Sequence, residues 1–356
     1  MSKTLLLMAG GTGGHVFPGL AVADVLRERG WKIVWMGRPD GFEARAVPTR
    51  GYEMAWIRFA ALRGKGLLRK LLLPFNLLSG FWQALRAIRR VRPDVVLGMG
   101  GYVSFPGGMM AALLGRPLVI HEQNSIAGLA NRVLARVADC VLCGFPDVLP
   151  KGRWVGNPVR PEIAGLPLPS ARFSTRDDAA PWRLLVLGGS LGAAAINEMV
   201  PQGIALIPEA ERPAILHQAG EKHLATLKAN YAAAGVRADC VAFIEDMAGA
   251  YAWADLTLCR AGALTVAELA AAGMASVLVP FPFAVDDHQT ANARFLADAG
   301  AARLLPQNEM TPEAVARLLG RAPGEWRHMA ERARALAKPE AAETVAHVCE
   351  TAGERP

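Results

Sequence analysis

The chain of 356 residues contains little cysteine and no leader pattern. Its five cysteines are an odd number scattered over a long chain, which argues against a disulfide framework and favours a reducing compartment. Cys140 and Cys143 have the spacing of half a zinc site, but the sequence has no second such pair, so no metal site is expected. The apolar N-terminal stretch is short and lacks a small-residue cleavage pattern, so we expect no signal peptide and a cytoplasmic protein.

Acidic residues are missing from one stretch of the chain. Residues 54–93 hold nine Lys and Arg and no Asp or Glu, which exceeds the +7 net charge of the whole chain. Within it, residues 71–82 are rich in Leu and Phe, but Pro74 and Gly80 interrupt a run that is already shorter than the roughly 20 apolar residues needed to span a bilayer. Apolar side chains flanked by Arg and Lys are typical of a segment that lies on an anionic membrane surface, so residues 63–92 are expected to bind one.

Two other interpretations of this basic stretch stay open. The leucines could pack inside a helix pair while the arginines form a solvated face. Binding of nucleic acid has less support, because the cluster is poor in aromatic residues and matches no recognition motif. We therefore expect no nucleic-acid partner.

The common nucleotide-binding fingerprints are also absent. No Walker A sequence occurs. The dinucleotide fingerprint requires G-x-G-x-x-G/A at the first turn and an acidic residue at the end of the second strand. Here the turn at residues 11–16 ends in Val16, and the second expected strand runs into Arg38. The sequence therefore excludes an ordinary NAD site and indicates no cofactor.

What the chain does contain is three glycine clusters, each after an apolar run, at residues 10–14, 98–108 and 188–192. Glycines at the end of a strand let backbone N–H groups approach a ligand, and a following helix adds unpaired donors and a positive dipole end for a phosphate. The first two clusters offer room for a diphosphate. Because the first and third open the two halves of the chain, they predict a ligand held in a cleft between two similar domains.

Short β-rich runs alternate with helical stretches along the chain. Near-continuous apolar runs predict strands buried on both faces, so we expect an α/β protein with two parallel, doubly wound domains. Five prolines punctuate residues 157–182, and we place the domains at residues 1–160 and 161–339, with residues 340–356 forming a helix that packs back on the first domain. The expected strands are residues 4–9, 32–36, 53–58, 95–99, 118–121 and 140–143, and then 183–187, 214–218, 240–244, 256–259, 276–280 and 302–305.

Seven motifs, in order along nearly the whole chain, resemble one known family. They are Gly-Gly-Thr-Gly-Gly-His at 10–15, Gly-Met-Gly-Gly-Tyr-Val-Ser at 98–104, His-Glu-Gln-Asn at 121–124, Gly-Asn-Pro-Val-Arg at 156–160, Gly-Gly-Ser-Leu-Gly-Ala at 188–193, Cys-Arg-Ala-Gly-Ala-Leu-Thr-Val-Ala-Glu at 259–268 and Asp-Asp-His-Gln-Thr-Ala-Asn at 286–292. Together they resemble the MurG family of bacterial transferases, glycosyltransferase family 28. These enzymes move N-acetylglucosamine from UDP-GlcNAc to the C4 hydroxyl of undecaprenyl-diphosphate-linked N-acetylmuramoyl-pentapeptide.

The resemblance implies a GT-B architecture, in which two Rossmann-like domains face a central cleft. The donor nucleotide would bind the C-terminal domain and the lipid-linked acceptor the N-terminal one. It further implies an inverting transferase of peptidoglycan synthesis that needs no cofactor and no obligatory metal. Such an enzyme would lie peripherally on the cytoplasmic face of the inner membrane, with cell-wall and division proteins as possible partners.

The same resemblance assigns roles to residues around the acceptor. His15 is the candidate general base for the acceptor hydroxyl, since an imidazole can accept a proton near neutral pH. Glu122 competes for that role or orients the acceptor. The residues expected to hold the acceptor diphosphate are Gly13, Gly14, Gly100, Gly101 and Tyr102.

Residues expected to bind UDP-GlcNAc follow from the same motifs. Glu268 would bind the ribose diol, although Thr265-x-x-Glu268 also satisfies the capping-box pattern, which needs no ligand. Ile244 would offer backbone groups to uracil, and Leu191 stands where some relatives have Gln. The full expected set is Thr12, Gly13, Gly14, Asn124, Arg160, Ser190, Ile244, Ala263, Leu264, Thr265, Val266, Ala267, Glu268 and Gln289.

Two other functions stay open from the sequence. A UDP-GlcNAc 2-epimerase of the same architecture would convert UDP-GlcNAc without any lipid. A non-catalytic, membrane-bound nucleotide-sugar binder would bind UDP-GlcNAc and turn nothing over.

Overall fold

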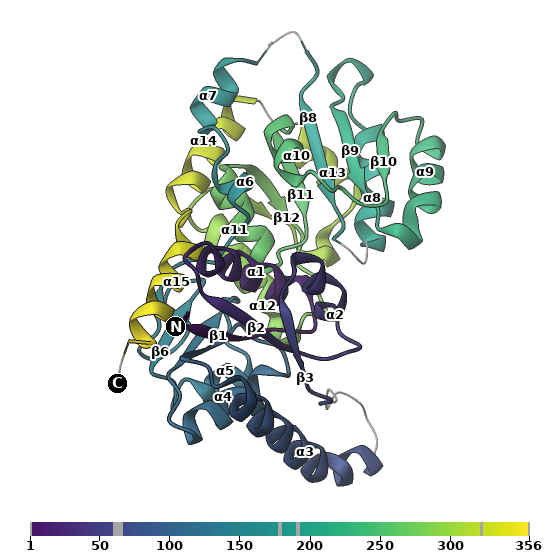
Figure 1. Ribbon diagram of the computed structural model, residues 1–356. Coiled ribbons are helices and arrows are strands. Elements are labelled where there is room, and N and C mark those ends of the chain that lie inside the picture. Colours follow the sequence, from purple (N-terminus) through teal and green to yellow (C-terminus); the bar gives the residue numbers. More distant parts are fainter. Residues whose placement is uncertain (1, 60–66, 177–179, 190–192, 321–322, 355–356) are drawn as a thin grey trace. The chain divides into compact units, whose positions relative to one another are not determined.

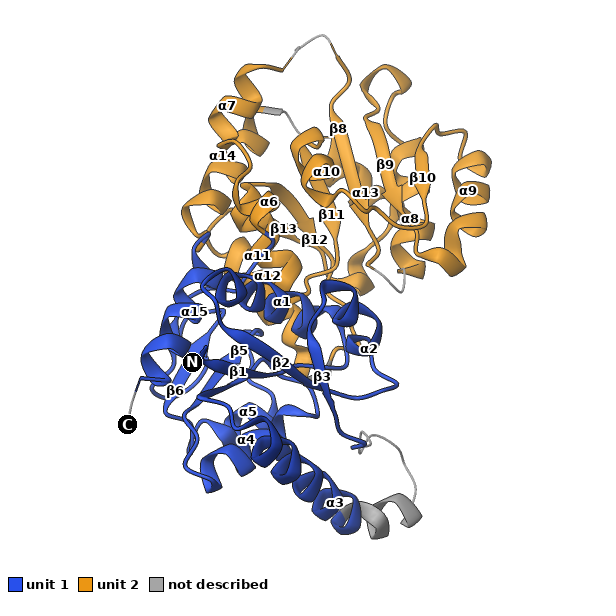
Figure 2. Cartoon of the chain, in the orientation of Figure 1, with its two compact units in different colours: residues 1–160, 339–356 blue, residues 161–338 orange. Residues whose placement is uncertain are grey.

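The computed structural model describes residues 2–59, 67–176, 180–189, 193–320 and 323–354 (Figure 1). The chain divides into two compact units, which are coloured separately in Figure 2. Unit 1 comprises Met1–Arg160 and Pro339–Pro356, and unit 2 comprises Pro161–Lys338. Each unit is built on a parallel sheet with helices between its strands, so the expected α/β class with two Rossmann-like domains is confirmed.

Unit 1 contains a seven-stranded sheet in the order β3-β2-β1-β4-β5-β6-β7, in which all neighbouring strands are parallel. The chain order reverses between β1 and β4, where Met8 lies opposite Gly98. Loops that leave the carboxyl ends of strands at such a reversal diverge and open a ligand crevice. The strands are β1 (Thr4–Met8), β2 (Lys32–Gly37), β3 (Glu53–Trp56), β4 (Val95–Gly98), β5 (Leu118–Glu122), β6 (Cys140–Cys143) and β7 (Arg153–Trp154).

Successive residues of β1 face opposite sides of the sheet, and both sides are buried. Leu5 and Leu7 belong to the apolar cluster that includes side chains of the helices at residues 13–28 and 341–352, whereas Leu6 and Met8 belong to the cluster that includes side chains of the helices at residues 67–91, 104–113 and 129–134. The apolar run of β1 therefore contributes side chains to two hydrophobic cores, one on each side of the sheet. The helices of unit 1 are α1 (Gly13–Glu28), α2 (Glu43–Ala46), α3 (Leu67–Val91), α4 (Ser104–Leu113), α5 (Leu129–Leu134) and α15 (Ala341–Ala352), with a 3-10 turn η1 (Pro48–Arg50).

Helix α15, at the end of the chain, packs against α1 of unit 1. Its Val345 and Cys349 are fully buried in the same core as Leu5. At the surface, Arg29 forms ion pairs with Glu343 and Glu350 of this helix. The last segment of the chain is thus part of the core of the first unit.

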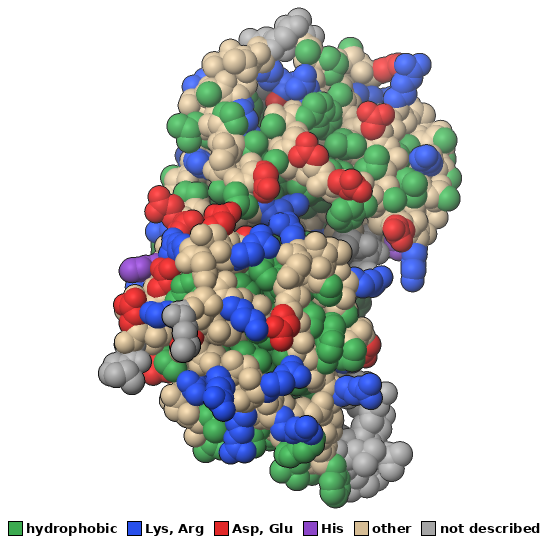
Figure 3. Space-filling model, viewed as in Figure 1, with side chains coloured by type: hydrophobic (Ala, Val, Ile, Leu, Met, Phe, Trp, Pro, Cys, Tyr) green, Lys and Arg blue, Asp and Glu red, His purple; other side chains and the backbone are tan. Residues whose placement is uncertain are grey.

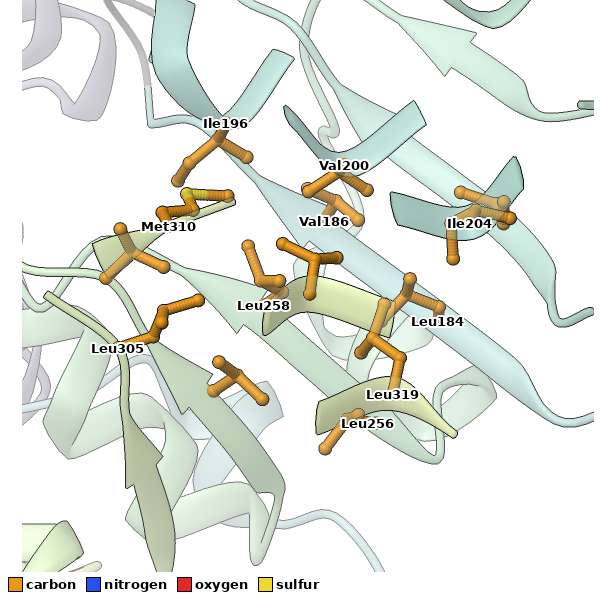
Figure 4. Close-up of a cluster of buried hydrophobic side chains, with 14 of the residues drawn as sticks. Leu184, Val186, Ile196, Val200, Ile204, Leu256, Leu258, Leu305, Met310 and Leu319 are labelled. Carbon is orange, nitrogen blue, oxygen red and sulfur yellow. The ribbon is translucent and has the colours of Figure 1, made fainter. Parts of the chain in front are cut away.

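Unit 2 contains a six-stranded parallel sheet in the order β10-β9-β8-β11-β12-β13, and its order reverses between β8 and β11. Leu184 and Val186 of β8 pack with Leu258 of β11 and with Ile196 and Val200 of α8 (Figure 4). The strands are β8 (Arg183–Leu187), β9 (Ala214–Gln218), β10 (Asp239–Val241), β11 (Leu256–Cys259), β12 (Ala275–Leu278) and β13 (Ala302–Leu304).

The helices of unit 2 connect these strands. They are α6 (Pro161–Ala164), α7 (Pro169–Ser174), α8 (Ala194–Ala205), α9 (Leu224–Ala233), α10 (Met247–Trp253), α11 (Ala263–Ala272), α12 (His288–Ala297), α13 (Pro312–Leu319) and α14 (Pro323–Ala335). Short 3-10 turns lie at η2 (Glu209–Glu211), η3 (Glu221–His223), η4 (Val285–Asp287) and η5 (Gln307–Glu309).

Every expected strand has an observed counterpart, but the bounds need corrections: the strands expected at 53–58 and 276–280 end two residues early, at Trp56 and Leu278. The strand expected at 240–244 is observed as Asp239–Val241, so Ile244 lies in the loop that follows it. Strand β7, Arg153–Trp154, was not expected, because two residues carry no period that a sequence pattern can reveal.

Candidate active site

The first glycine cluster forms the turn from β1 into α1. Gly11 adopts a φ of 96°, and Thr12 is the extended N-cap residue of α1, with a side chain that makes no capping hydrogen bond. The backbone N–H groups of Gly13 and Gly14, at the first two helical positions, have no acceptor within the helix. These donors and the positive end of the helix dipole are the groups that bind a phosphate.

A buried carboxylate behind this turn holds it in place. Glu43 of α2 has no exposed surface, and its carboxylate accepts hydrogen bonds from the backbone N–H of Gly11 (3.0 Å) and of Arg38 (2.9 Å). A side chain on Gly10, Gly37 or Gly41 would overlap the Glu43 side chain. Sequence reasoning missed Glu43, because its partners lie on other elements.

The second glycine cluster packs against the first. Gly100 and Gly101 adopt φ values of 94° and 84°, and a Cβ atom on Gly101 would overlap the carbonyl oxygen of Gly10. The Ser104 hydroxyl lies within hydrogen-bond distance of the carbonyl oxygens of Met8 (3.0 Å) and Gly100 (2.8 Å). The structure therefore brings together the four glycines expected around the acceptor diphosphate, and Tyr102 is exposed beside them.

His15 lies in the first turn of α1 and is half-buried. Its Nδ1 atom lies 2.9 Å from Oε1 of Gln123. Nε2 of Gln123 lies 3.2 Å from Nδ1 of His121, whose Nε2 lies 2.9 Å from the carbonyl oxygen of Gly156. Burial lowers the pKa of His121 to about 4, so that this ring is neutral near pH 7. Gln123 and His121 were quoted in a motif, but neither was assigned a role from sequence.

Glu122, the other candidate base, is buried at the end of β5. One of its carboxylate oxygens accepts from the backbone N–H (3.0 Å) and side-chain amide (3.3 Å) of Asn124. The other accepts from the backbone N–H of Gly128 (3.1 Å) and the side-chain amide of Asn131 (2.9 Å). Both oxygens therefore tie down the loop that carries half-buried Asn124.

Unit 2 repeats the strand–glycine–helix arrangement. β8 ends at Leu187, and Gly189 follows with a φ of 79°. Ser190 and Leu191 lie outside the described residues, and α8 begins at Ala194.

Arg160, a further residue expected to bind the donor, is half-buried and is the last residue of the first segment of unit 1.

Helix α11 contains Glu268, the residue expected to bind the ribose, and its N-cap residue contradicts the capping-box interpretation. Its N-cap residue is Gly262, so Thr265 lies inside the first turn and cannot cap the helix. Glu268, one turn further on, is buried and accepts a hydrogen bond from the Tyr251 hydroxyl at 3.4 Å. The expected donor-binding residues Ala263, Leu264, Thr265, Val266 and Ala267 form the first half of this helix.

Two further donor-binding candidates already use one of their polar groups within unit 2. The backbone N–H of Ile244 donates to Oε1 of Gln218 (3.0 Å), so its carbonyl is the group that could accept from a base. Oε1 of Gln289 accepts from the backbone N–H of Phe281 (2.9 Å), which leaves its NH₂ group to donate. Gln218 was not expected from sequence.

The expected membrane segment includes the long helix α3. Phe75, Leu78 and Trp82, spaced three and four residues apart, lie on one face of it and are 71%, 65% and 56% exposed. The Arg86 guanidinium lies 4.6 Å from the centre of the Trp82 ring. Figure 3 shows Lys and Arg side chains gathered over the lower part of unit 1, beside hydrophobic side chains at its edge.

Residues 63–66 of the expected membrane stretch lie outside the described part of the chain. Among the described helices, none combines the length and the apolar character needed to cross a bilayer.

Comparisons with known proteins give a consistent result. The model of the glycosyltransferase family 28 N-terminal domain matches residues 5–143, and that of the glycosyltransferase family 28 C-terminal domain matches residues 183–348. A protein of Dechloromonas aromatica (strain RCB) is 67% identical over 98% of this chain and 99% of its own length, and one of Azoarcus sp. (strain BH72) is 66% identical over 99% of both chains. Both are named UDP-N-acetylglucosamine--N-acetylmuramyl-(pentapeptide) pyrophosphoryl-undecaprenol N-acetylglucosamine transferase.

Solved structures agree with these relatives. The crystal structure of Acinetobacter baumannii MurG is 42% identical, covers 98% of this chain and 99% of its own, and has a TM-score of 0.85. A glycosyltransferase of kitacinnamycin, 18% identical over 99% of each chain with a TM-score of 0.70, shares the fold.

Proposed function

The chain belongs to glycosyltransferase family 28, and from this membership and the geometry of its site we infer its reaction. It is a hexosyltransferase of peptidoglycan synthesis that transfers N-acetylglucosamine from UDP-GlcNAc to N-acetylmuramyl-pentapeptide linked to pyrophosphoryl-undecaprenol. The observation that carries this conclusion is the identity of about two thirds, over nearly the full length, with relatives named for that activity.

The proposed chemistry is one displacement at the anomeric carbon of the donor sugar. The C4 hydroxyl oxygen of the acceptor attacks, and its proton passes to a base. The bond from the anomeric carbon to the phosphate oxygen breaks, and its electron pair leaves with UDP. Because the nucleophile enters opposite the leaving group, an α-linked donor gives a β-linked product.

His15 is the proposed base, and Glu122 the residue that orients the loop beside it. The His15 ring is half-buried at the start of α1, next to the two packed glycine loops. The Glu122 carboxylate accepts four hydrogen bonds from its own loop and from α5, so both of its oxygens are already engaged in holding that loop. Asn124, held by Glu122, is then positioned to contact the donor sugar.

The acceptor diphosphate would bind at the glycine loops of unit 1. The N–H groups of Gly13 and Gly14 and the dipole of α1 supply donors and positive potential. Gly100 and Gly101 have no side chains, so their backbone would approach the diphosphate closely, and Tyr102 is exposed at the edge of this site. This site would hold the acceptor in reach of His15.

The donor would bind unit 2 through its own helix N-termini. Gly188, Gly189 and Ser190 precede α8 and would take the UDP diphosphate, whose charge grows as it leaves. The first turn of α11 offers further N–H groups, and the Glu268 carboxylate would accept from the ribose hydroxyls. We assign uracil to the Ile244 carbonyl, the sugar hydroxyls to the Gln289 amide, a phosphate to Arg160 and further donor contacts to Thr12.

We further propose that the enzyme lies on the cytoplasmic face of the inner membrane. The exposed apolar face of α3 and the neighbouring arginines support peripheral attachment to anionic lipid. Attachment there would bring the site to its lipid-linked acceptor. Cell-wall and division proteins are proposed partners at the same membrane.

One assay tests the reaction. The purified full chain is given labelled UDP-GlcNAc and lipid-linked muramoyl-pentapeptide in detergent, and we expect label in the lipid together with released UDP. Conversion of UDP-GlcNAc without lipid would instead indicate a 2-epimerase. Binding of UDP-GlcNAc with no transfer at any pH or detergent would indicate a non-catalytic binder.

A variant pair tests the base. His15→Ala is expected to lower kcat by about 10²–10⁴, the usual contribution of a general base, with little change in KM. His347→Ala, which removes an exposed histidine of α15, is the matched control and should behave as the wild type. Equal kcat in the two variants would contradict the assignment of His15.

A further inference from the structure

Four groups of unit 1 form a continuous line of hydrogen bonds that ends at the ring of His15. They are the Gly156 carbonyl, His121, Gln123 and His15. We propose that this line determines which nitrogen of His15 carries the proton, so that Gln123 and His121 are positioning residues for the base. The inference rests on the proposed role of His15.

The line starts from a group that can only accept. The Gly156 carbonyl oxygen lies 2.9 Å from Nε2 of His121, so Nε2 must carry a proton and donate it. His121 is fully buried, and burial lowers the pKa of its ring to about 4. A neutral imidazole has one N–H, so Nδ1 of His121 presents a lone pair.

That lone pair orients the side-chain amide of Gln123. Only the NH₂ group can donate to Nδ1 of His121, at 3.2 Å, so Oε1 must point the other way, toward His15. A flipped amide would set its oxygen against the lone pair of His121. The backbone of Gln123 is held as well, because the Asn157 amide donates to its carbonyl oxygen at 3.0 Å.

Oε1 of Gln123 in turn selects the tautomer of His15. An amide oxygen only accepts, so Nδ1 of His15, 2.9 Å away, must carry a proton. Nε2 of the neutral ring is then the unprotonated nitrogen, which a general base requires. A ring with its proton on Nε2 would donate to the acceptor hydroxyl instead of taking its proton.

The backbone of Gly100 covers the bond between His15 and Gln123. A Cβ atom at Gly100 would lie 2.7 Å from Nδ1 of His15 and 3.2 Å from Oε1 of Gln123. Any side chain there would push the pair apart. The glycine at this position therefore protects the tautomer-selecting hydrogen bond, independently of any contact with phosphate.

The partner of His15 is an amide and carries no charge. The acidic groups of the neighbouring loops are Glu122 of β5, which follows His121, and Glu43 of α2, which binds the Gly11 turn. Both carboxylates are occupied by hydrogen-bond donors from backbone or amide groups. The Gln123 amide therefore orients the ring without placing a negative charge beside it.

Two substitutions at Gln123 distinguish a role in positioning His15 from a purely structural role of the residue. Gln123→Met removes the acceptor and should lower kcat by about tenfold or more, within the range of a general base, with little change in KM. Gln123→Glu keeps an acceptor for Nδ1 of His15 but loses the donor to Nδ1 of His121, so at high pH it should recover part of the kcat that Gln123→Met loses. Its carboxylate should also move the acidic limb of the pH–kcat profile upward by about one unit or more.

The tautomer of His15 is measured by NMR on the full chain labelled with ¹⁵N-histidine. The signals of His15 are assigned by their absence from the spectrum of His15→Ala. We expect the His15 proton on Nδ1 in the wild type and a mixture of tautomers in Gln123→Met. Asn230→Leu, which removes a side-chain amide hydrogen bond to the Asn197 carbonyl in unit 2, is the control and should change neither readout.

The outcomes are distinct. A wild-type ring protonated on Nε2, or unchanged spectra and pH profiles in both Gln123 variants, would overturn the proposal, and the wild-type spectrum decides even if Gln123→Met fails to fold. If the wild type has the Nδ1 proton but His15→Ala still transfers sugar at the full rate, the hydrogen-bond line stands and the assignment of His15 as base falls.

Discussion

Gly101 and Gly30 have nearly the same φ angle in different surroundings. Their φ values are 84° and 83°, but a Cβ atom on Gly101 would overlap the Gly10 carbonyl, whereas one on Gly30 would meet nothing within 4 Å. Gly30→Ala should cost only the left-handed strain, about 1–2 kcal/mol of unfolding free energy. Gly101→Ala should cost more, because the two glycine loops must also separate.

Urea unfolding of both variants measures these costs, and the transfer assay supplies a second readout. Gly101→Ala should lose transfer activity, since Gly10 and Gly101 connect the two loops of the proposed acceptor site. Gly30→Ala should keep it. Equal losses of stability and activity in the two variants would contradict the close packing of the loops.

Two buried carboxylates in unit 1 hold loops of the proposed site. Glu43 holds the Gly11 turn and Glu122 holds the Asn124 loop, each through backbone N–H donors. A buried carboxylate is stable only when such donors replace its water. Both residues therefore act on the site through the loops that they anchor.

At the scale of elements, α3 carries the proposed membrane contact. Phe75→Ser and Leu78→Ser should each weaken binding of the full chain to anionic vesicles, because each removes an apolar side chain worth about 1–2 kcal/mol when partly buried in lipid. Higher salt should weaken binding further by screening the arginines. Vesicle sedimentation measures both effects.

A matched substitution controls for a general loss of apolar surface. Leu206→Ser alters a leucine of similar exposure, 55%, in unit 2. It should leave vesicle binding unchanged. If it weakens binding as much as Leu78→Ser does, the attachment is not specific to α3.

At the scale of the whole molecule, the two units are not two consecutive halves of the chain. Residues 339–356 return to unit 1, where α15 supplies buried side chains and pairs with Arg29. Removal of these residues should expose the apolar face of α1 and destabilise unit 1, while unit 2 keeps its own core. Loss of Val345 and Cys349 alone removes two fully buried apolar side chains.

Hydrogen exchange followed by mass spectrometry distinguishes the units in the truncated chain. Peptides of β1 and β4 should lose protection, whereas those of β8 and β11 should keep it. Unchanged protection in β1 and β4 would mean that α15 is dispensable for unit 1.

Much of the fold could be predicted from the sequence. Apolar runs predicted the strands, because a parallel strand buried on both faces is apolar at nearly every position. Glycine clusters identified the loops, and the ordered motifs indicated the family. The capping-box interpretation and the end of the strand expected at 240–244 were wrong for reasons that lie in the neighbouring residues. Nothing in Thr265-x-x-Glu268 reveals that Gly262 is the N-cap, and nothing after Val241 marks the end of β10.

Only the tertiary structure decided which groups meet. The reversal of strand order between β1 and β4 sets the Gly10 turn against Gly101, and the hydrogen bond from His15 to Gln123 joins residues 108 positions apart. A sequence determines burial along each element through its hydrophobic period, since that period is local. The partner of a polar side chain depends on which elements become neighbours, and the packing of the whole sheet decides that.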